Sequence, residues 1–502
     1  MVLAFALVAV LTGLPYLRAG LDPPPGRAFL GFFFFVDDSY HYLSYVQQAA
    51  EGAFLFRNKL LLEDHPPSLV NLEWWLVGKL SVALGGHPLV AYRLLGLAAA
   101  FFLIWGTDRW LRRCGLPDSH RLPALLLASL GGGFGGLLFL AGRPAFSCLD
   151  FATGLFPSLE LLSNPHFVVG TALVLWTLWA FLEARTTKDY LLGVLLGSIL
   201  GLVRPYDLIL VVAIHGLGVL AAEPPATWIR RLLPLAGLAP VALYNYWVFY
   251  VNRSFAFFTT GAYPFPPRED FVVAFGPAAA LALAALWSRP PGPEARAARV
   301  RLLVWIAMGV LVIAVKAVTF SLQFLVGFAL PFFVFAAVGL SRFRPAVTVA
   351  ATLALSTTLL VALRMVLTPH PRWEVPRERL GAAFALRAYC QPDEVVFAPQ
   401  DIGLYAIGFT ACKAFVSHPI MPGFADRVDE ARAFYEASDA QARSALLDRE
   451  RVAHLVLPGD PGPRPTAWLG EETPFRREAV VGRAPTAVSL YSRAVPSPPG
   501  RR

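Results

Sequence analysis

Long hydrophobic blocks recur along most of this 502-residue chain and constrain its fold more than any other feature. A transmembrane helix needs roughly 17–25 mostly apolar residues, and many of the blocks reach that length. Only 15% of the residues are charged, against about 25% in an average soluble protein. The pattern predicts a polytopic α-helical membrane protein. We place about eleven blocks, although ten to thirteen fit the sequence: 1–17, 88–108, 122–141, 166–183, 190–203, 206–222, 232–251, 270–287, 302–319, 321–340 and 346–367.

The loops between these blocks alternate in charge. A net charge of +9 would suit a nucleic-acid partner, but the basic residues gather in short loops between blocks, which argues for no nucleic acid. The positive-inside rule places these basic loops in the cytoplasm, together with the N-terminus. They contain Arg109, Arg112, Arg113, Arg121, Arg185, Lys188, Arg230, Arg231, Arg289, Arg296, Arg299, Arg301, Arg342 and Arg344. The predicted outer loops are 20–87, 142–165, around 204–206, 252–269 and around 320.

Beyond Leu367 the hydrophobic blocks stop and the chain changes character. An odd number of spans places this tail outside the cytoplasm. Strands are expected at about 394–398, 453–457 and 487–492, and helices at 377–389, 425–436 and 440–449. We therefore predict two domains. Residues 1–367 form a transmembrane domain whose outer loop, 20–87, carries interfacial helices, and residues 368–502 form an extracytoplasmic α/β domain.

The cysteines and one glycine cluster offer no familiar site. None of Cys114, Cys148, Cys390 and Cys412 shows CxxC spacing, which argues against a zinc ribbon. Cys390 and Cys412 can pair if the tail lies outside the cytoplasm, while two unpaired thiols are the alternative we favour. The run 131–136, GGGFGG, lies inside a hydrophobic block with no strand before it. It therefore indicates close helix packing or a kink instead of a phosphate loop.

An acidic pair, Asp37 and Asp38, follows an apolar run in the first outer loop. The segment after it, 39–52, has the spacing of an amphipathic helix. One interpretation is that an Asp caps this helix by accepting backbone N–H bonds. A single Asp is enough for a cap, so the second carboxylate lacks a structural reason. An acid at a membrane surface beside apolar residues should have a raised pKa, which suits a general base.

The rest of this loop resembles a known superfamily. Residues 65–69 read HPPSL, an amphipathic helix is expected at 68–86, and AYRL at 91–94 opens the next block. With the acidic pair, this pattern resembles GT-C glycosyltransferases, above all the protein O-mannosyltransferase and aminoarabinose-transferase branch, over about residues 1–220. The resemblance implies a bacterial inner-membrane enzyme. It would transfer a sugar from a polyprenyl-phosphate-linked donor to a glycan, lipid or protein acceptor on the outer face, with inversion.

The resemblance also assigns roles to residues. Asp37 falls where the family has its catalytic acid, and it would deprotonate or orient the acceptor hydroxyl. Asp38 falls where the neighbouring residue is usually Glu. Aminoarabinose transferases have a Lys before the Pro-Pro pair, and this chain departs from them with His65. A protonated His can bind the donor phosphate; an exposed loop His is the alternative.

Further candidates come from another outer loop, which contains Arg143, Asp150 and Glu160. A second outer acid is often needed in this class, and we assign these residues to substrate binding, with ordinary solvated side chains as the alternative. The resemblance to oligosaccharyltransferases allows a divalent metal between Asp37 and either Asp150 or Glu160, although no tight ligand motif supports it. No other cofactor is indicated.

Arg204 and Lys316 are positive groups near the outer face, where few others occur. A charge inside a bilayer costs roughly 2.5–3.5 kcal/mol on insertion scales, so something should offset it. The phosphate of a lipid-linked donor would do so. Snorkelling, or a pair between Arg204 and Asp207, is the alternative interpretation.

Two other functions fit parts of the sequence. A transporter or flippase for lipid-linked glycans predicts charges deep within many spans and repeated span patterns. The sequence shows one deep candidate, Lys316, and no repeat. An inactive GT-C-like assembly factor would share the same pattern. We therefore predict the glycosyltransferase, with the lipid bilayer and a lipid-linked sugar as its partners.

Overall fold

The chain divides into two compact units that do not follow its linear order. The computed structural model describes residues 1–144, 148–152, 154–259, 265–315, 321–436, 439–471, 473–483 and 485–494. The membrane unit consists of Met1–Ala19 and Tyr92–Thr368, and the loop–tail unit consists of Gly20–Ala91 and Pro369–Arg502. The first outer loop therefore packs with the tail, whereas the sequence grouped it with the spans.

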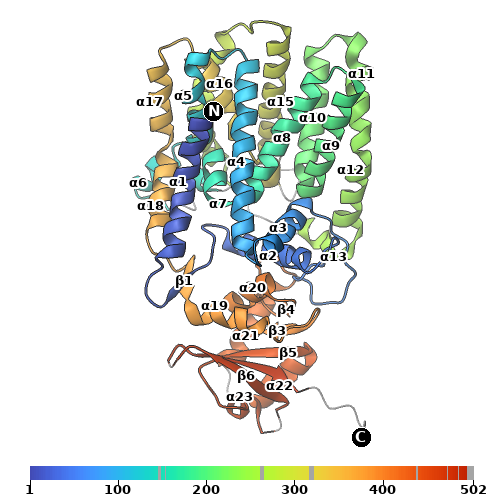
Figure 1. Ribbon diagram of the computed structural model, residues 1–502, viewed down its shortest axis with the longest axis vertical. Helices are drawn as coiled ribbons and strands as arrows, with labels where there is room; N and C mark the ends of the chain where they lie inside the picture. The colour runs from blue at the N-terminus through green and yellow to red at the C-terminus, as the bar shows by residue number, and fades with distance from the viewer. Residues whose placement is uncertain are drawn as a thin grey trace. The chain divides into compact units, whose positions relative to one another are not determined.

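The membrane unit is helical throughout its described residues, and its long helices run side by side (Figure 1). Its helices are α1 Val2–Leu21, α4 Pro88–Arg113, α5 Arg121–Leu130, α6 Gly135–Leu140, α7 Pro157–Ser163, α8 Pro165–Glu183, α9 Thr187–Val203, α10 Pro205–Ala222, α11 Trp228–Leu232, α12 Ala239–Tyr246, α13 Arg253–Ala256, α14 Arg268–Leu283, α15 Pro293–Val315, α16 Ala329–Leu340, α17 Pro345–Leu355 and α18 Thr357–Leu367. The first residues of α4 and the last of α1 belong to the other unit.

Fewer spans are found than the sequence suggested. Within the described residues, eight helical segments are long and apolar enough to cross a membrane, or nine if the bent pair α17 and α18 is one span. Two expected blocks account for the difference. The helix of block 190–203, α9, has 17 residues, and block 122–141 is divided into α5 and α6. The prediction of a polytopic helical membrane protein with a small C-terminal α/β domain is confirmed.

The break between α5 and α6 is the glycine cluster, which packs closely as predicted. Backbone groups freed by a helix break inside a bilayer must find partners within the protein. The N–H of Gly132 donates to the Leu355 carbonyl at 2.8 Å, and the N–H of Gly136 donates to Thr358 Oγ1 at 2.9 Å. The block predicted at 122–141 is therefore two helices, α5 and α6, and the chain breaks at the glycine run for which close packing or a kink was expected.

Replacing Gly133 by alanine should destabilise the membrane unit by about 3 kcal/mol, since overpacking against atoms that cannot move costs about that much. A Cβ atom there would lie 2.0 Å from the Ala274 carbonyl oxygen. Thermal unfolding in detergent measures the effect. Gly216→Ala is the control, because a Cβ at Gly216 meets nothing within 4 Å. Equal melting temperatures for the two variants would contradict the close packing.

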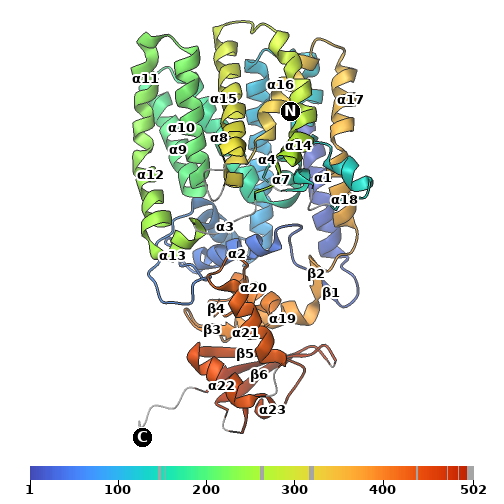
Figure 2. The same cartoon turned by 180° about the vertical axis from the view of Figure 1, so that it is seen from behind.

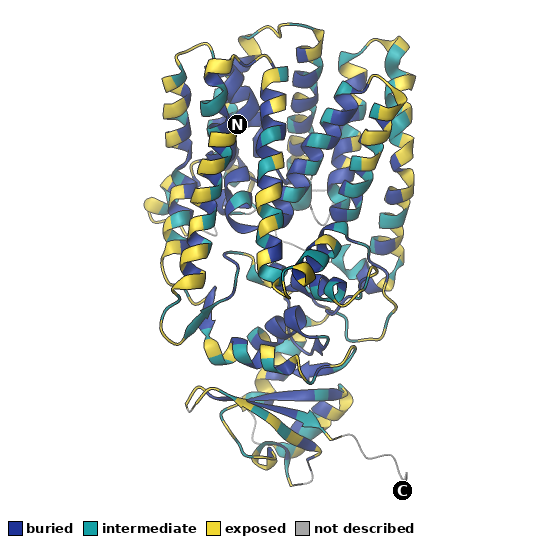
Figure 3. Cartoon of the chain, in the orientation of Figure 1, coloured by how far each residue is buried: buried dark blue, intermediate teal, exposed yellow. Residues whose placement is uncertain are grey.

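Helices α14 and α16, which are labelled in Figure 2, pack against each other, and their contact is aromatic. The Phe275 ring stacks on Phe156 at 4.9 Å and meets Phe328 edge-on at 5.0 Å. The outward faces of the helices are instead exposed (Figure 3), and they carry large apolar side chains such as Ile209 and Leu353. An apolar exterior around a packed core is the arrangement that a bilayer requires.

The loop–tail unit is an α/β domain assembled from both of its segments. Its elements are β1 Arg27–Phe29, α2 Val36–Ala50, α3 Leu72–Ala83, β2 Glu374–Pro376, α19 Arg377–Leu386, β3 Val395–Phe397, α20 Gln400–Phe409, β4 Lys413–Ala414, α21 Phe424–Glu436, α22 Ala440–Arg449, β5 Val452–Pro458, α23 Thr466–Leu469, β6 Phe475–Val481 and β7 Val488–Arg493. The sheet has the order β4-β3-β5-β7-β6, with β3 parallel to its two neighbours and β7 antiparallel to its two. β1 and β2 pair antiparallel, so a strand of the loop meets a strand of the tail.

Helix α2 of the loop packs on α20 of the tail because a glycine allows close approach. A Cβ at Gly408 would lie 2.8 Å from Cδ1 of Tyr40. With only hydrogen at that position, the Tyr40 ring fits between Tyr405, at 5.1 Å, and Phe409, at 5.4 Å between ring centroids. Tyr40 is fully buried. Burying an aromatic side chain of this kind stabilises the contact by roughly 1.5–3 kcal/mol, so α2 is firmly attached to the tail.

Candidate active site

The acidic pair lies at the start of α2, where the backbone is unusual. Phe34 and Phe35 have φ angles of 53° and 41°, a left-handed conformation that is an outlier for bulky residues. Phe35 is the N-cap of α2 and makes no side-chain cap. The interpretation of the pair as a helix cap is therefore wrong: Asp37 and Asp38 occupy the first turn instead. Backbone strain of this kind gathers at functional sites.

A histidine from the tail joins the acidic pair. His418 Nε2 lies 3.1 Å from Asp38 Oδ1. The His418 side chain is 6% exposed and that of Asp38 is 36% exposed. His41 of α2 lies beside His418, with 5.8 Å between the two imidazole centroids. The Nε2 of His41 is 3.0 Å from the Tyr45 hydroxyl. Two carboxylates and two imidazoles therefore share one site.

The pKa values of this site depart from the ordinary range. Burial raises the pKa of Asp37, and the neighbouring charge of Asp38 raises it further, while His418 and Arg372 act in the opposite direction. Asp37 nevertheless keeps solvent access. Burial lowers the pKa of His41 well below its usual value, and His418 and Lys59 lower it further. His41 is therefore neutral, and Asp37 is a carboxylate that takes up a proton more readily than usual.

Sequence reasoning found Asp37 and Asp38 but missed His418, which lies 380 positions along the chain from Asp38. The signal that points to it is its place a few residues beyond the short buried strand β4. In open α/β sheets, functional residues gather at the carboxyl ends of parallel strands. β4 is parallel to β3, so His418 occupies such a position.

His65 is held within its own loop. Its Nε2 accepts the backbone N–H of Asn58 at 3.0 Å, and its Nδ1 lies 2.9 Å from the Glu63 carbonyl oxygen. Because Nε2 accepts and Nδ1 faces an acceptor, the ring is in its neutral, Nδ1-protonated form. Binding of a phosphate by Nε2 would require the bond from Asn58 to break. Its donor-phosphate role stays a prediction.

A cavity of about 230 Å³ lies at the other end of α2 from the acidic pair. Two of the five lysines of the chain, Lys59 and Lys413, are buried in its wall. Burial lowers the pKa of Lys59 to about 7, and its Nζ donates to the Gln47 side chain at 3.0 Å and to the Ile407 carbonyl at 3.2 Å. These lysines tie the loop to the tail. The lining residues are Gln48, Glu51, Ala53, Leu55, Arg57, Asn58, Lys59, Pro67, Pro392, Asp393, Ala411 and Lys413.

Two of the predicted substrate-binding residues form a buried polar network in the membrane unit. Arg204 Nε lies 2.7 Å from Asp207 Oδ2, and both side chains are buried. This is the ion pair that the sequence offered as the alternative to phosphate binding. Glu160 is fully buried and accepts from Thr171 Oγ1 at 3.0 Å and from the Gly327 N–H at 3.1 Å. Protein groups therefore meet the hydrogen-bonding needs of both residues.

The other candidates of the membrane unit also have protein partners. Asp150 is buried and accepts from the Gly135 N–H at 2.9 Å and from Thr358 Oγ1 at 3.1 Å, so it holds the start of α6. Arg143 is half exposed and lies 3.7 Å from Asp270 Oδ1. Lys316 falls outside the described residues. Substrate binding by Arg143, Asp150, Glu160 or Arg204 stays a prediction.

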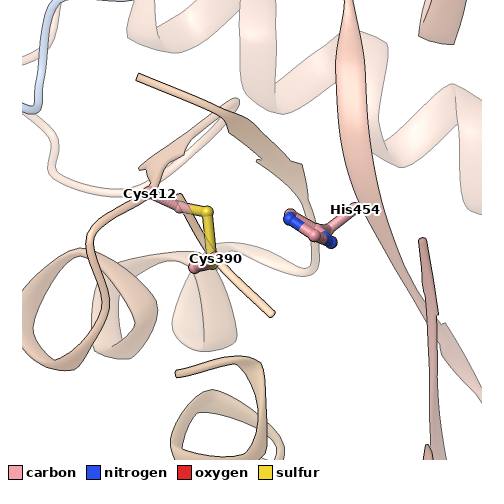
Figure 4. Close-up of side chains that lie close together, drawn as sticks. All are labelled: Cys390, Cys412 and His454. Atoms are coloured by element: carbon pink, nitrogen blue, oxygen red, sulfur yellow. A yellow bond between two sulfur atoms is a disulfide. The ribbon is translucent and has the colours of Figure 1, made fainter. Parts of the chain in front are cut away.

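The described residues contain one group of three side chains with metal-ligand spacing: Cys390, Cys412 and His454. Figure 4 shows the two cysteines joined as a disulfide, so the favoured interpretation of two unpaired thiols does not hold. Cys114 and Cys148 are free and buried. Within the described residues, neither Asp37 nor Asp38 belongs to a group of three such ligands. A metal ion between Asp37 and either Asp150 or Glu160 stays a prediction.

Comparison of the structure with solved structures identifies the fold. The chain resembles the aminoarabinose transferase ArnT from Cupriavidus metallidurans, solved bound to undecaprenyl phosphate, with a TM-score of 0.54 and 14% identity over 99% of each chain. It also resembles the mycobacterial arabinofuranosyltransferase AftD, with a TM-score of 0.55 and 17% identity over 98% of this chain and 40% of that one. The chain thus spans less than half the length of AftD.

A third similar structure is the oligosaccharyltransferase from Archaeoglobus fulgidus in complex with zinc and sulfate, with a TM-score of 0.53 and 13% identity over 91% of this chain and 67% of that one. No family model matches the sequence, and a comparison with curated proteins finds no match. At these identities the similarity concerns the fold. All three structures are GT-C glycosyltransferases. The helical membrane unit and the small α/β tail of this chain therefore have the GT-C fold.

Proposed function

We propose that this protein is a membrane glycosyltransferase that uses a polyprenyl-phosphate-linked sugar as its donor. The acceptor is a hydroxyl group on a glycan, lipid or protein at the outer face of the bacterial inner membrane. The observation that carries the proposal is the site at the start of α2, where a carboxylate with a raised pKa is held beside a second carboxylate and a buried His. The GT-C fold supplies the context for that site.

The reaction follows from the chemistry of the two substrates. The acceptor oxygen attacks the anomeric carbon, and a new C–O bond forms as the bond from that carbon to the phosphate oxygen breaks. The leaving phosphate takes the bonding electron pair and stays on the lipid. Asp37 accepts the proton of the acceptor hydroxyl, which is the work of a general base. Attack from the side opposite the phosphate inverts the anomeric configuration.

The nature of the donor is supported by the fold and by the chemistry of lipid-linked sugars. The polyprenyl chain keeps the donor phosphate at the bilayer surface, so the reactive carboxylate must be presented there. ArnT was solved with undecaprenyl phosphate, and we extend that class of lipid to this chain. The alternation of basic loops predicts a cytoplasmic N-terminus and an outer position for the loop with Asp37. If α17 and α18 form one span, the nine spans are an odd number, and the same alternation predicts an outer α/β tail.

The proposal is tested by profiling lipid-linked sugars and surface glycans in a strain that lacks the gene. We expect one lipid-linked sugar to accumulate and one glycan to lose that same sugar, because the donor is no longer consumed. Wild-type protein should reverse both changes. Equal glycan profiles with and without the gene would overturn the proposal.

Complementation with Asp37→Ala separates the proposal from its rivals. If the variant accumulates in the membrane and restores the glycan fully, the protein acts as a flippase or an assembly factor and not through Asp37. If the variant accumulates and the donor still builds up, the protein acts as the transferase.

A further inference from the structure

We infer that His418 is a positioning residue of the active site: it fixes the Asp38 carboxylate beside Asp37 by donating a hydrogen bond from Nε2, so that the α/β tail completes the site. The inference rests on the proposed function, because it assigns a role within the same reaction. Neither the acidic pair nor the fold predicts this role of His418, since His418 and Asp38 are 380 positions apart in the sequence.

The hydrogen bonds of the ring define its protonation. His418 Nδ1 accepts the backbone N–H of Ile420 at 3.0 Å, so Nδ1 carries no proton. The proton must then reside on Nε2, which faces Asp38 Oδ1 at 3.1 Å. Protonation of Nδ1 would direct two N–H groups at each other and break the bond to Ile420. His418 therefore donates from Nε2 to the Asp38 carboxylate.

The segment that carries His418 is rigid. The Met421 N–H donates to the His418 carbonyl at 3.0 Å, which closes a turn around the ring. A Cβ at Gly403 of α20 would lie 2.1 Å from the Val416 carbonyl oxygen, so α20 packs directly against the backbone that leads to His418. α20 also packs on α2, which carries the acidic pair. His418 and Asp38 therefore lie on two segments that both pack against α20.

A hydrogen bond to a carboxylate stabilises the charged form. With Asp38 held in place, Asp37 remains the carboxylate with solvent access. The charged or titratable groups that act on Asp37 are Asp38 of α2 and His418, Arg372 and Tyr405 of the tail. His418 lowers the pKa of Asp37 and Asp38 raises it, so loss of the Nε2–H donor would let Asp37 bind a proton more readily. A protonated Asp37 cannot accept the proton of the acceptor hydroxyl.

The test compares His418→Ala with His418→Gln, whose side-chain amide keeps a donor near the position of Nε2. Activity is the rate at which the lipid-linked sugar that accumulates in the deletion strain is consumed in membranes of that strain, measured against pH. We expect His418→Ala to lower the rate at least 10-fold and to move the acid limb of the pH profile to higher pH. His418→Gln should recover most of the rate and leave the limb in place.

The control is His454→Gln in the same unit. His454 is a similarly buried imidazole, but it is bonded to Glu394 and Ser492, each at 2.9 Å. We expect a lower melting temperature with an unmoved acid limb, which is what a merely structural role produces. On an Asp38→Asn background, His418→Ala should move the limb no further, because the acceptor carboxylate is already gone.

A wild-type rate and profile for His418→Ala would overturn the inference while leaving the transferase standing. Wild-type protein without any transferase activity would instead defeat the proposed function. If His418→Ala fails to accumulate, the inference is tested with His418→Gln and with the double variant that also contains Asp38→Asn. A moved limb in His418→Gln would contradict the role of the Nε2–H donor.

Discussion

Replacing Asp37 by asparagine should lower the rate of sugar transfer by about 10²–10⁴-fold, the usual contribution of a general base. Asparagine keeps the shape of the side chain but cannot accept the proton of the acceptor hydroxyl. The sugar donor and the acceptor should bind with little change, so the variant should have a lower turnover number and a similar KM. The measurement is consumption of the lipid-linked sugar in membranes that contain equal amounts of wild-type protein or variant.

The pH dependence gives the same residue a second signature. Because the pKa of Asp37 is raised above the ordinary Asp value of 3.8, activity should be present above the raised pKa and be lost as pH falls through it. The acid limb therefore lies at a higher pH than an ordinary Asp would produce. In the Asp37→Asn variant the residual activity should lack this limb.

The matched control is Asp22→Asn, an exposed acid in the same loop. It should leave both the rate and the acid limb unchanged. A rate for Asp37→Asn within a factor of two or three of wild type would rule out the general-base role. An unchanged acid limb in that variant would assign the limb to another group.

Removing the disulfide should lower the stability of the loop–tail unit substantially. The double variant Cys390→Ala/Cys412→Ala opens a bridge that spans 22 positions, and a closed loop of that length stabilises a fold by about 3 kcal/mol. Cys412 also follows Thr410, whose carbonyl accepts from Lys59 Nζ. We therefore expect the attachment of the first loop to loosen with the bridge.

Thermal unfolding of the full-length protein in detergent, with and without a reductant, checks this effect. The reductant should lower the melting temperature of the wild-type protein toward that of the double variant. It should have no effect on the double variant, which provides the control for reductant acting elsewhere. A melting temperature that is the same in all four samples would show that the bridge does not form.

Much of the membrane unit could be predicted because a bilayer leaves few solutions. Backbone groups in hydrocarbon must bond within their own segment, so a long apolar block is a helix. The block at 122–141 is divided into two helices, and that break depends on partners such as Leu355 and Thr358 that lie far away in sequence. The tail was predicted in part: three strands and three helices lie where expected, whereas β2, α20, β4, α23 and β6 were missed.

The reasons for these misses are physical. α20 is apolar on nearly all sides, and eight of its residues are buried, so it lacks the periodicity that reveals a surface helix. β6 alternates exposed residues with residues that are buried or half-buried, but its charged side chains concealed the apolar alternation expected of a strand. The active site was half predicted for a related reason. Local sequence identifies the acidic pair, while His418 meets it only through the packing of α2 on α20.

The shared unit of loop and tail has a consequence for how the protein is made. The chain between them, residues 92–368, contains 277 residues (368 − 92 + 1). A ribosome that adds about 5–20 residues per second needs roughly 14–55 s to cross that interval. During this time Asp37 is already synthesised, but the partner segment that carries His418 does not exist. The chain therefore acquires a complete site only near the end of its own translation, and a product cut short before the tail cannot assemble it.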